Sequence, residues 1–383
     1  MTLLDNLKHR EIVPTRKNEK WRYSDPELLT IPPNLGIKED SSNCVNIQEF
    51  IENDDYYIIV LSGMTTTKNS ILPKIGIELS TSNDYQIFNS DQFEYKHQVV
   101  QNLKNSHFAV NIHIKKPLKK PIKLVRYISF SPFFSRVNLI IEKNIKCTLY
   151  EEILACNSQK KYCNNLLRVK LDDNSSLNHF ISGSFQAKVR GLYTMEVSCS
   201  INSIYQSYFI HAFYKSYRFE SEVNLNGLNA AAQFYGVCVA NKEQLFDCLI
   251  SVNHHASMTS SIQHYNQVLN DNSIGSFYSN VFIQKSLGAV KAHQLNKNMI
   301  IDNKSKAFSR PTLDINSEDI VCSHGAATGN IDVQALDYLY SRGINKEEAK
   351  GLIIMGLLKS VFSDTNLKNE EQNYLYIQLE NLL

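Results

Sequence analysis

The sequence lacks several features that define common protein classes. Glycine (14) and proline (9) are scarce among the 383 residues, which excludes collagen-like chains and Gly- or Pro-rich disordered linkers. No run of about 18 apolar residues occurs, so we expect no membrane-spanning helix. The formal net charge is only +2, which argues against a dedicated nucleic-acid binder. The first ten residues carry charges in place of the apolar run of a signal peptide, which predicts a cytoplasmic protein.

The sequence also lacks the usual signatures of paired cysteines and of common enzymes. Its eight cysteines are scattered from Cys44 to Cys322, and none forms a C-x-x-C pair. In a chain of this length, this pattern indicates free thiols in a reducing compartment. A phosphate-binding loop of the G-x-x-x-x-G-K type is missing, and so is a G-x-S-x-G nucleophile motif. We therefore expect that this chain does not hydrolyse ATP by itself.

The long middle region, residues 106–320, has the pattern of a β-structure. Short runs rich in Val, Ile, Phe, Tyr and Thr recur there, and they predict strands at 137–141, 147–153, 166–171, 177–181, 194–199 and 277–283. Asparagines recur between the runs at intervals of about 20–30 residues, the period range of solenoids. These are Asn144, Asn174, Asn202, Asn226, Asn272 and Asn303. Asparagine tolerates the left-handed backbone of a tight corner. The pattern favours a β-helix (β-solenoid) over the alternative, an antiparallel sandwich.

The two ends of the chain differ from this region. Residues 1–105 predict a mixed N-terminal domain, a small α/β lead-in, with a short helix at 3–9 and with Trp21 as a packing anchor between prolines. Residues 321–383 predict a helical domain with helices at 331–340, from Asn345 onward, and at 369–382. Its apolar positions include Leu336, Leu339, Leu352, Ile353 and Leu357. So few helical residues must pack on the β-region or on another protein, so we take these five as candidate partner contacts.

The candidate chemistry lies in the stretch from Glu318 to Gly329. Cys322 and His324 are two residues apart, so they point to the same side if this stretch is a strand. Thiolate and imidazole are preferred ligands of iron and zinc, whose centres usually have four ligands. Spacing alone favours the simpler interpretation, a buried cysteine and a hydrogen-bonded histidine. The alternative is a metal site to which another part of the fold or a partner chain adds the other ligands.

Other chemically suggestive residues have simpler explanations. The adjacent His254 and His255 would face opposite sides of a strand, and His264 and His293 complete no ligand pattern. The pair Asp172-Asp173, which invites a glycosidase reading, lies in a stretch typical of a turn. The basic run 115–120 is short and isolated, as expected of a solvated loop.

Three segments together resemble a known family. The segments 311–315 (PTLDI), 319–326 (DIVCSHGA) and 341–344 (SRGI) are similar to the C-terminal signature of the SufB/SufD family of iron–sulfur cluster assembly proteins. The stretch around Trp21 (EKWRYS) resembles the N-terminal motif of the SufD branch. This resemblance is sharp over residues 311–345 and loose across the rest of the β-region.

The resemblance implies a fold, partners and a site. It implies a right-handed parallel β-helix with a helical C-terminal domain. It also implies a scaffold subunit that is not an enzyme, binds no nucleotide itself, pairs with SufB and docks the ATPase SufC. A transient iron–sulfur cluster would form at the SufB–SufD interface, with His324 and then Cys322 contributing from this chain. The resemblance therefore favours a metal site at Cys322 and His324 over a purely structural pair. A homodimer in isolation is also compatible with the resemblance.

Three alternatives remain at this point. The chain could be a SufB-like scaffold that accepts sulfur itself. It could be a purely structural partner without a ligand of its own. A β-helix polysaccharide enzyme belongs to a third class, and neither a secretion signal nor a carboxylate-lined cleft is evident for it.

Overall fold

The computed structural model describes residues 13–32, 55–62, 65–66, 76–82, 96–106, 108–155, 160–185 and 188–382. The helix predicted at 3–9 and the cysteines Cys44 and Cys156 lie outside these residues. The six other cysteines are all free thiols, as predicted. No helix in the described ranges is both long enough and apolar enough to cross a membrane.

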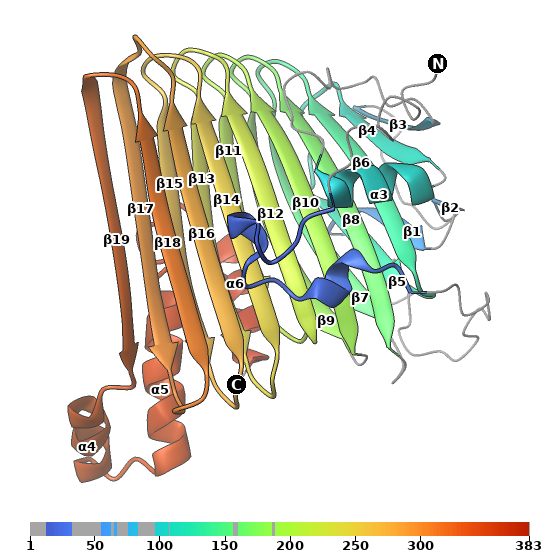
Figure 1. Ribbon diagram of the computed structural model, residues 1–383. Helices are drawn as coiled ribbons and strands as arrows, with labels where there is room; N and C mark the ends of the chain where they lie inside the picture. The colour runs from blue at the N-terminus through green and yellow to red at the C-terminus, as the bar shows by residue number, and fades with distance from the viewer. Residues whose placement is uncertain are drawn as a thin grey trace.

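The chain winds into a flattened solenoid in which each coil gives one strand to each of two facing sheets (Figure 1). The ten-stranded sheet has the order β19 (Asp319–Asn330), β17 (Gly288–Ile300), β15 (Ser260–Leu269), β13 (Ala231–Ala240), β11 (Ile204–His211), β9 (Ser176–Phe185), β7 (Lys146–Ala155), β5 (Ile122–Ile128), β1 (Tyr57–Ser62) and β2 (Thr65–Thr66). The nine-stranded sheet has the order β18 (Lys306–Ile315), β16 (Ile274–Ile283), β14 (Leu245–His254), β12 (Ser216–Leu225), β10 (Val189–Cys199), β8 (Lys161–Leu171), β6 (Phe133–Ile141), β4 (Ala109–Ile114) and β3 (Ile77–Ser82).

The pairing of these strands decides between the two β-folds that the sequence left open. Neighbouring strands are parallel from β4 and β5 onward, and only β2 and β3 pair antiparallel with a neighbour. A sandwich of hairpins would be antiparallel throughout. The mainly β, parallel β-solenoid predicted from the sequence is therefore confirmed, and all six of the predicted strand segments lie within strands.

Asparagines stack at one corner of successive coils. Asn144, Asn174, Asn202 and Asn229 all have positive φ, between 54° and 61°. The side-chain amide of each of the last three donates to the side-chain oxygen of the asparagine one coil earlier, at 3.2, 2.9 and 3.0 Å. Their separations in sequence are 30, 28 and 27 residues, so this ladder follows the length of the coil. The sequence analysis assigned this corner to Asn226, three residues too early.

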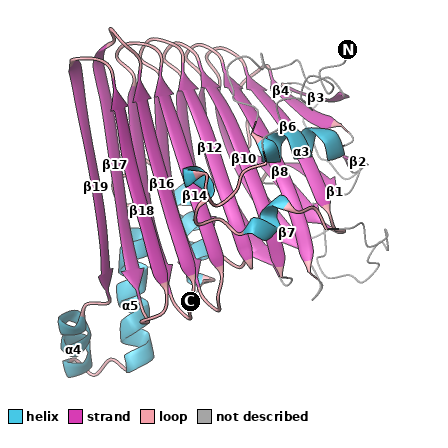
Figure 2. Ribbon diagram, viewed as in Figure 1, coloured by secondary structure: helices cyan, strands magenta, loops and turns pink. Residues whose placement is uncertain are grey.

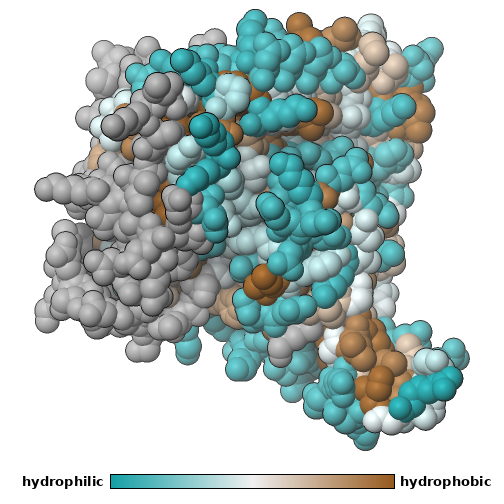
Figure 3. Space-filling view, turned by 180° about the vertical axis from the view of Figure 1, so that it is seen from behind, coloured by the Kyte–Doolittle hydropathy of each residue, from teal (hydrophilic) through white to brown (hydrophobic). Residues whose placement is uncertain are grey.

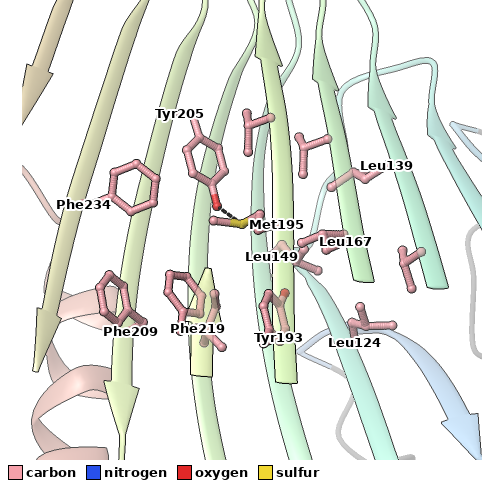
Figure 4. Packing of buried hydrophobic residues seen from close by; sticks show 14 of the residues in the cluster. Leu124, Leu139, Leu149, Leu167, Tyr193, Met195, Tyr205, Phe209, Phe219 and Phe234 are labelled. Carbon is pink, nitrogen blue, oxygen red and sulfur yellow. Dashed lines mark hydrogen bonds between the residues drawn. The ribbon is translucent and has the colours of Figure 1, made fainter. Parts of the chain in front are cut away.

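The core between the two sheets changes character along the solenoid. Leucines such as Leu124, Leu139 and Leu167 fill the early coils, and aromatic rings such as Phe209 and Phe234 fill the middle (Figure 4). In the last coils the buried inner positions of β15 and β17 carry amides: Gln263, Gln267, Gln294, Asn296 and Asn298. The interior is therefore mostly apolar in the early and middle coils and lined by amides in the last ones.

Helices cover the outer faces of both sheets (Figure 2). The helices of the described residues are η1 (Glu19–Trp21), η2 (Pro26–Leu29), α3 (His97–Asn105), α4 (Val333–Ser341), α5 (Lys346–Lys359) and α6 (Asn369–Glu380), of which α4 lies beyond the solenoid. The first three lie against the nine-stranded sheet, where Trp21 and Leu28 pack on Tyr162 and Leu192. The end of α5, the turn that follows it and α6 pack on the ten-stranded sheet through Leu358, Phe362, Leu375 and Leu379.

The C-terminal helices begin later than the sequence boundary at 320. That boundary falls inside β19, which continues to Asn330, and α4 starts at Val333. The predicted cap of the next helix is present, because the Asn345 side chain accepts the Glu348 N–H at 2.9 Å. Asp332 caps α4 in the same way, by accepting from the N–H groups of Gln334 and Ala335.

Candidate metal centre at the open end of the solenoid

The solenoid ends in two strands that no further coil covers. Within the described chain, β19 pairs only with β17 and β18 pairs only with β16. Figure 1 shows both strands at one end of the molecule. An edge strand presents unpaired N–H and C=O groups that can pair with a strand of another chain. This open end can therefore accept a strand of another chain.

Cys322 and His324 lie on the inner face of β19. Cys322 is in register with Ala292 of β17, and His324 is in register with Gln294. Both β17 residues are buried between the sheets, whereas their neighbours Lys291 and His293 are exposed. Residues in register on parallel strands point to the same side. The Cys–His pair therefore faces the interior at the open end.

The two side chains have different surroundings. Cys322 is half-buried and packs against the apolar cluster that includes Val290 and Ala292. Burial raises the pKa of the Cys322 thiol, although a hydrogen bond with the Ala292 backbone opposes the shift. The thiol therefore has to release a proton before it can bind a metal. His324 is exposed, and its ring makes no hydrogen bond with any described residue.

The Cys–His pair is an incomplete ligand set within this chain. Among the residues that the structure describes, no group of three or more His, Cys, Asp or Glu side chains could hold a metal ion. Thiolate and imidazole are nevertheless suitable ligands for iron, and iron–sulfur clusters normally take four. The residues present fit one side of a shared site.

Two of the other candidate histidines, His254 and His293, and the aspartate pair lie in structural settings. His254 is fully buried and hydrogen-bonds the hydroxyls of Thr259 and Ser261, at 2.8 and 2.9 Å. His293, on the outer face of β17, hydrogen-bonds Ser323 at 2.8 Å. Asp172-Asp173 forms part of a corner turn, as predicted. The run 115–120 is a loop, also as predicted.

A buried ionic cluster inside the early coils escaped the sequence analysis. Glu151 accepts hydrogen bonds from Arg126 at 2.6 Å and from Tyr193 at 2.9 Å, and it lies 3.2 Å from His179. All four side chains are fully buried. Burial alone would raise the pKa of Glu151, but Arg126 and His179 outweigh it and lower that pKa to about 2. The alternation of strands places these residues inward, but the sequence does not show that they meet.

The five candidate partner contacts of the C-terminal helices differ in exposure. Leu336 is buried, whereas Leu339, Ile353 and Leu357 are half-buried. Leu352 is 50% exposed. Figure 3 shows hydrophobic side chains gathered on the lobe that α4 and α5 form beyond the solenoid. Two further exposed side chains of α4, Val333 (64%) and Tyr338 (58%), were missed because the sequence analysis followed only its core-facing stripe.

Comparison with known proteins gives one consistent result. The family model described as "SUF system FeS cluster assembly, SufBD core domain" matches residues 128–357. The iron–sulfur cluster assembly protein SufD of Escherichia coli is 22% identical over 382 residues, covering 94% of this chain and 87% of that protein. A SufBD family protein of Synechocystis is 22% identical over 251 residues, covering 62% of this chain and 55% of that protein. SufD of Plasmodium falciparum is 25% identical over 263 residues, covering 67% of this chain but 18% of that much longer protein.

Proposed function

The protein belongs to the SufBD family of iron–sulfur cluster assembly proteins, on the SufD branch, and from that membership we propose that it is a scaffold subunit that builds a cluster jointly with a second subunit. The cluster is cargo and not a resident cofactor. The observation that carries the proposal is the place of Cys322 and His324, on the inner face of the last strand of an open solenoid.

The open end provides the contact with the second subunit. A SufB chain that pairs its own edge strand with β18 or β19 would cover the inner face of the last coil. It would then enclose Cys322 and His324 and add the missing ligands. The same edges can accept a second copy of this chain, so a homodimer in isolation is compatible with this proposal. Thiolate chemistry of this kind suits the reducing cytoplasm.

The helices α4 and α5 form the docking site for the ATPase SufC. Leu352, Val333 and Tyr338 are the exposed apolar side chains available to it, whereas Leu336 is buried. The far end of α5 is fixed to the ten-stranded sheet through Leu358. Movement of a docked ATPase would therefore act on the solenoid through α5. A ligand that binds at one site changes a distant site only if it binds two states of the protein with different affinity. The interface between this chain and SufB must therefore have two arrangements.

The experiment is cluster reconstitution on the complex of this chain with SufB and SufC, using Cys322→Ala and His324→Ala. We expect each variant to lose cluster, measured by iron and sulfide content and by visible absorption. His293→Ala is the matched control, because His293 is exposed on the opposite face of the neighbouring strand. Normal cluster content in both site variants would mean that this chain is a purely structural partner of SufB without a ligand of its own. Persulfide formation on this chain alone would favour the SufB-like, sulfur-accepting alternative.

A further inference from the structure

Three side chains occupy the same inner position on the last three coils of the ten-stranded sheet. Gln263 of β15 is in register with Gln294 of β17, and Gln294 is in register with His324 of β19. Gln263 is fully buried and Gln294 is 3% exposed. Both glutamines are buried at the same position of successive coils, so their hydrogen bonds can be compared directly.

The amide of Gln263 is fully satisfied across the interior. Its NH₂ group donates to the backbone oxygen of Asn280 in β16 at 3.3 Å. Its side-chain oxygen accepts from the Ser279 hydroxyl at 2.6 Å. One backbone carbonyl and one hydroxyl on the facing strand therefore fix both ends of this amide.

Gln294 repeats only half of this arrangement. Its NH₂ group donates to the backbone oxygen of Thr312 in β18 at 3.4 Å, and Thr312 is the register partner of Asn280. The register partner of Ser279, however, is Pro311, whose side chain has no hydrogen to donate. The Gln294 side-chain oxygen is left buried without a partner. An unsatisfied buried carbonyl is costly, so this oxygen calls for a donor.

We propose that the side-chain oxygen of Gln294 accepts a hydrogen bond from the ring of His324 and so positions that ring for the cluster. The inference rests on the proposed function. A neutral imidazole has one N–H and one lone pair, and binding of the N–H fixes which nitrogen is free to ligate a metal. Gln294 would hold the N–H toward the interior and leave the other nitrogen facing the partner subunit.

The neighbouring residues single out this pair. Asn296 also has an unpaired buried side-chain oxygen, but its register partner is Ala326, which has no side-chain donor. Cys322 lies over Ala292, which has no acceptor. Among the inner-facing side chains of β19, His324 is the one with a hydrogen-bond donor that is in register with an unpaired oxygen, and its ring has no hydrogen bond within the described chain that it would have to give up.

The test is the tautomer of His324 in the full chain, read from ring ¹⁵N shifts of histidine-labelled protein and assigned with His324→Ala. Gln294→Met removes the acceptor and keeps the shape of the side chain. Pro311→Ser keeps Gln294 but restores the hydroxyl that Ser279 supplies one coil earlier. Gln263→Met is the matched control, because it removes a glutamine amide at the equivalent position one coil earlier, which is not next to His324.

We expect one dominant tautomer in the wild type and in Gln263→Met, and a mixture in both Gln294→Met and Pro311→Ser. Cluster content of the complex should fall about tenfold in these two variants, as is typical for loss of a partner that orients a ligand. An unchanged tautomer in Pro311→Ser, or in a folded Gln294→Met, overturns the proposal. If the tautomer becomes mixed while the cluster content stays normal, the hydrogen bond is supported but His324 is not a cluster ligand. That result would contradict the proposed function separately from this inference.

Discussion

The guanidinium of Arg218 lies 4.0 Å from the ring centroid of Trp21, the only tryptophan of the chain. Arg218 also pairs with Asp247 and with Glu220, and it donates to the backbone oxygen of Lys20 at 2.8 Å. The arginine therefore joins the N-terminal segment 13–32 to the outer face of the nine-stranded sheet. Trp21 is 8% exposed, which confirms that it is a packing anchor.

Loss of this anchor should release the segment. For Trp21→Ala we predict a loss of about 3 kcal/mol in the free energy of unfolding, because a buried indole and a cation–π contact both disappear. Trp21→Phe keeps an aromatic face under Arg218 and should lose less. Urea denaturation measures the stability, and limited proteolysis shows whether 13–32 becomes accessible. Equal stability of the alanine and phenylalanine variants would contradict the role given to the ring.

The asparagine ladder makes a second prediction, at Asn174. This residue has φ of 57° and makes side-chain hydrogen bonds with the ladder asparagines on both sides. Asn174→Ala removes both bonds and leaves the left-handed backbone without the polar side chain that lets asparagine tolerate it, so we expect a loss of about 2 kcal/mol. Asn174→Gly removes the bonds but adopts the same backbone freely, so it should lose less. Thermal unfolding compares the two, and a glycine variant less stable than the alanine variant would be inconsistent with a left-handed corner.

Buried histidines predict loss of stability in acid. Burial lowers the pKa of His254 from 6.5 to about 4, and burial likewise lowers the pKa of His211 to about 3. A depressed pKa means that the unfolded chain binds protons first as the pH falls. The stability that these neutral rings contribute is complete above pH 6.5 and is lost as the pH falls toward 4.

The measurement is a comparison of wild type with His254→Gln, whose amide can still bond Thr259 and Ser261. Between pH 7 and pH 5 the wild type should lose about 2 kcal/mol relative to the variant, from a shift of about 1.4 kcal/mol per pH unit. Urea unfolding at several pH values gives both free energies. A difference between the two proteins that does not vary with pH would show that His254 is not titrating.

The sequence predicted the coils because stacking imposes a period that the corner residues must follow. Asn144, Asn174 and Asn202 are visible in the sequence for this reason. The next corner was misplaced because Asn226 and Asn229 lie within the same turn, and only the backbone shows that Asn229 adopts the left-handed conformation. Local composition predicts that a corner exists but does not identify the residue at its tip.

The partners of the site residues could not be predicted in the same way. The spacing of Cys322 and His324 gives a common face but does not tell the inner face from the outer one. That choice depends on the register of β19 against β17, which long-range pairing sets. Likewise, that Pro311 takes the position of Ser279 and leaves Gln294 without a hydroxyl donor can be seen only once the coils are aligned. Register therefore carries the information about the site that the sequence pattern lacks.

The last prediction concerns docking of the ATPase on the lobe of α4 and α5. Leu352 is 50% exposed on α5, whereas Leu358 near the end of the same helix is fully buried against the solenoid. For Leu352→Asp we expect at least a tenfold weaker Kd for SufC, because a charge would replace a central apolar contact. The stability of the chain should stay unchanged, because the position does not contribute to the core.

Leu228→Asp is the control for this substitution. Leu228 is 48% exposed at a corner of the solenoid, so the chemistry and the exposure are matched while the location differs. Calorimetric titration of SufC into each variant gives the two affinities, and urea unfolding confirms that both variants are folded. If Leu228→Asp weakened SufC binding as much as Leu352→Asp, the effect would come from added charge in general. The ATPase would then have to dock on a surface other than the helical lobe.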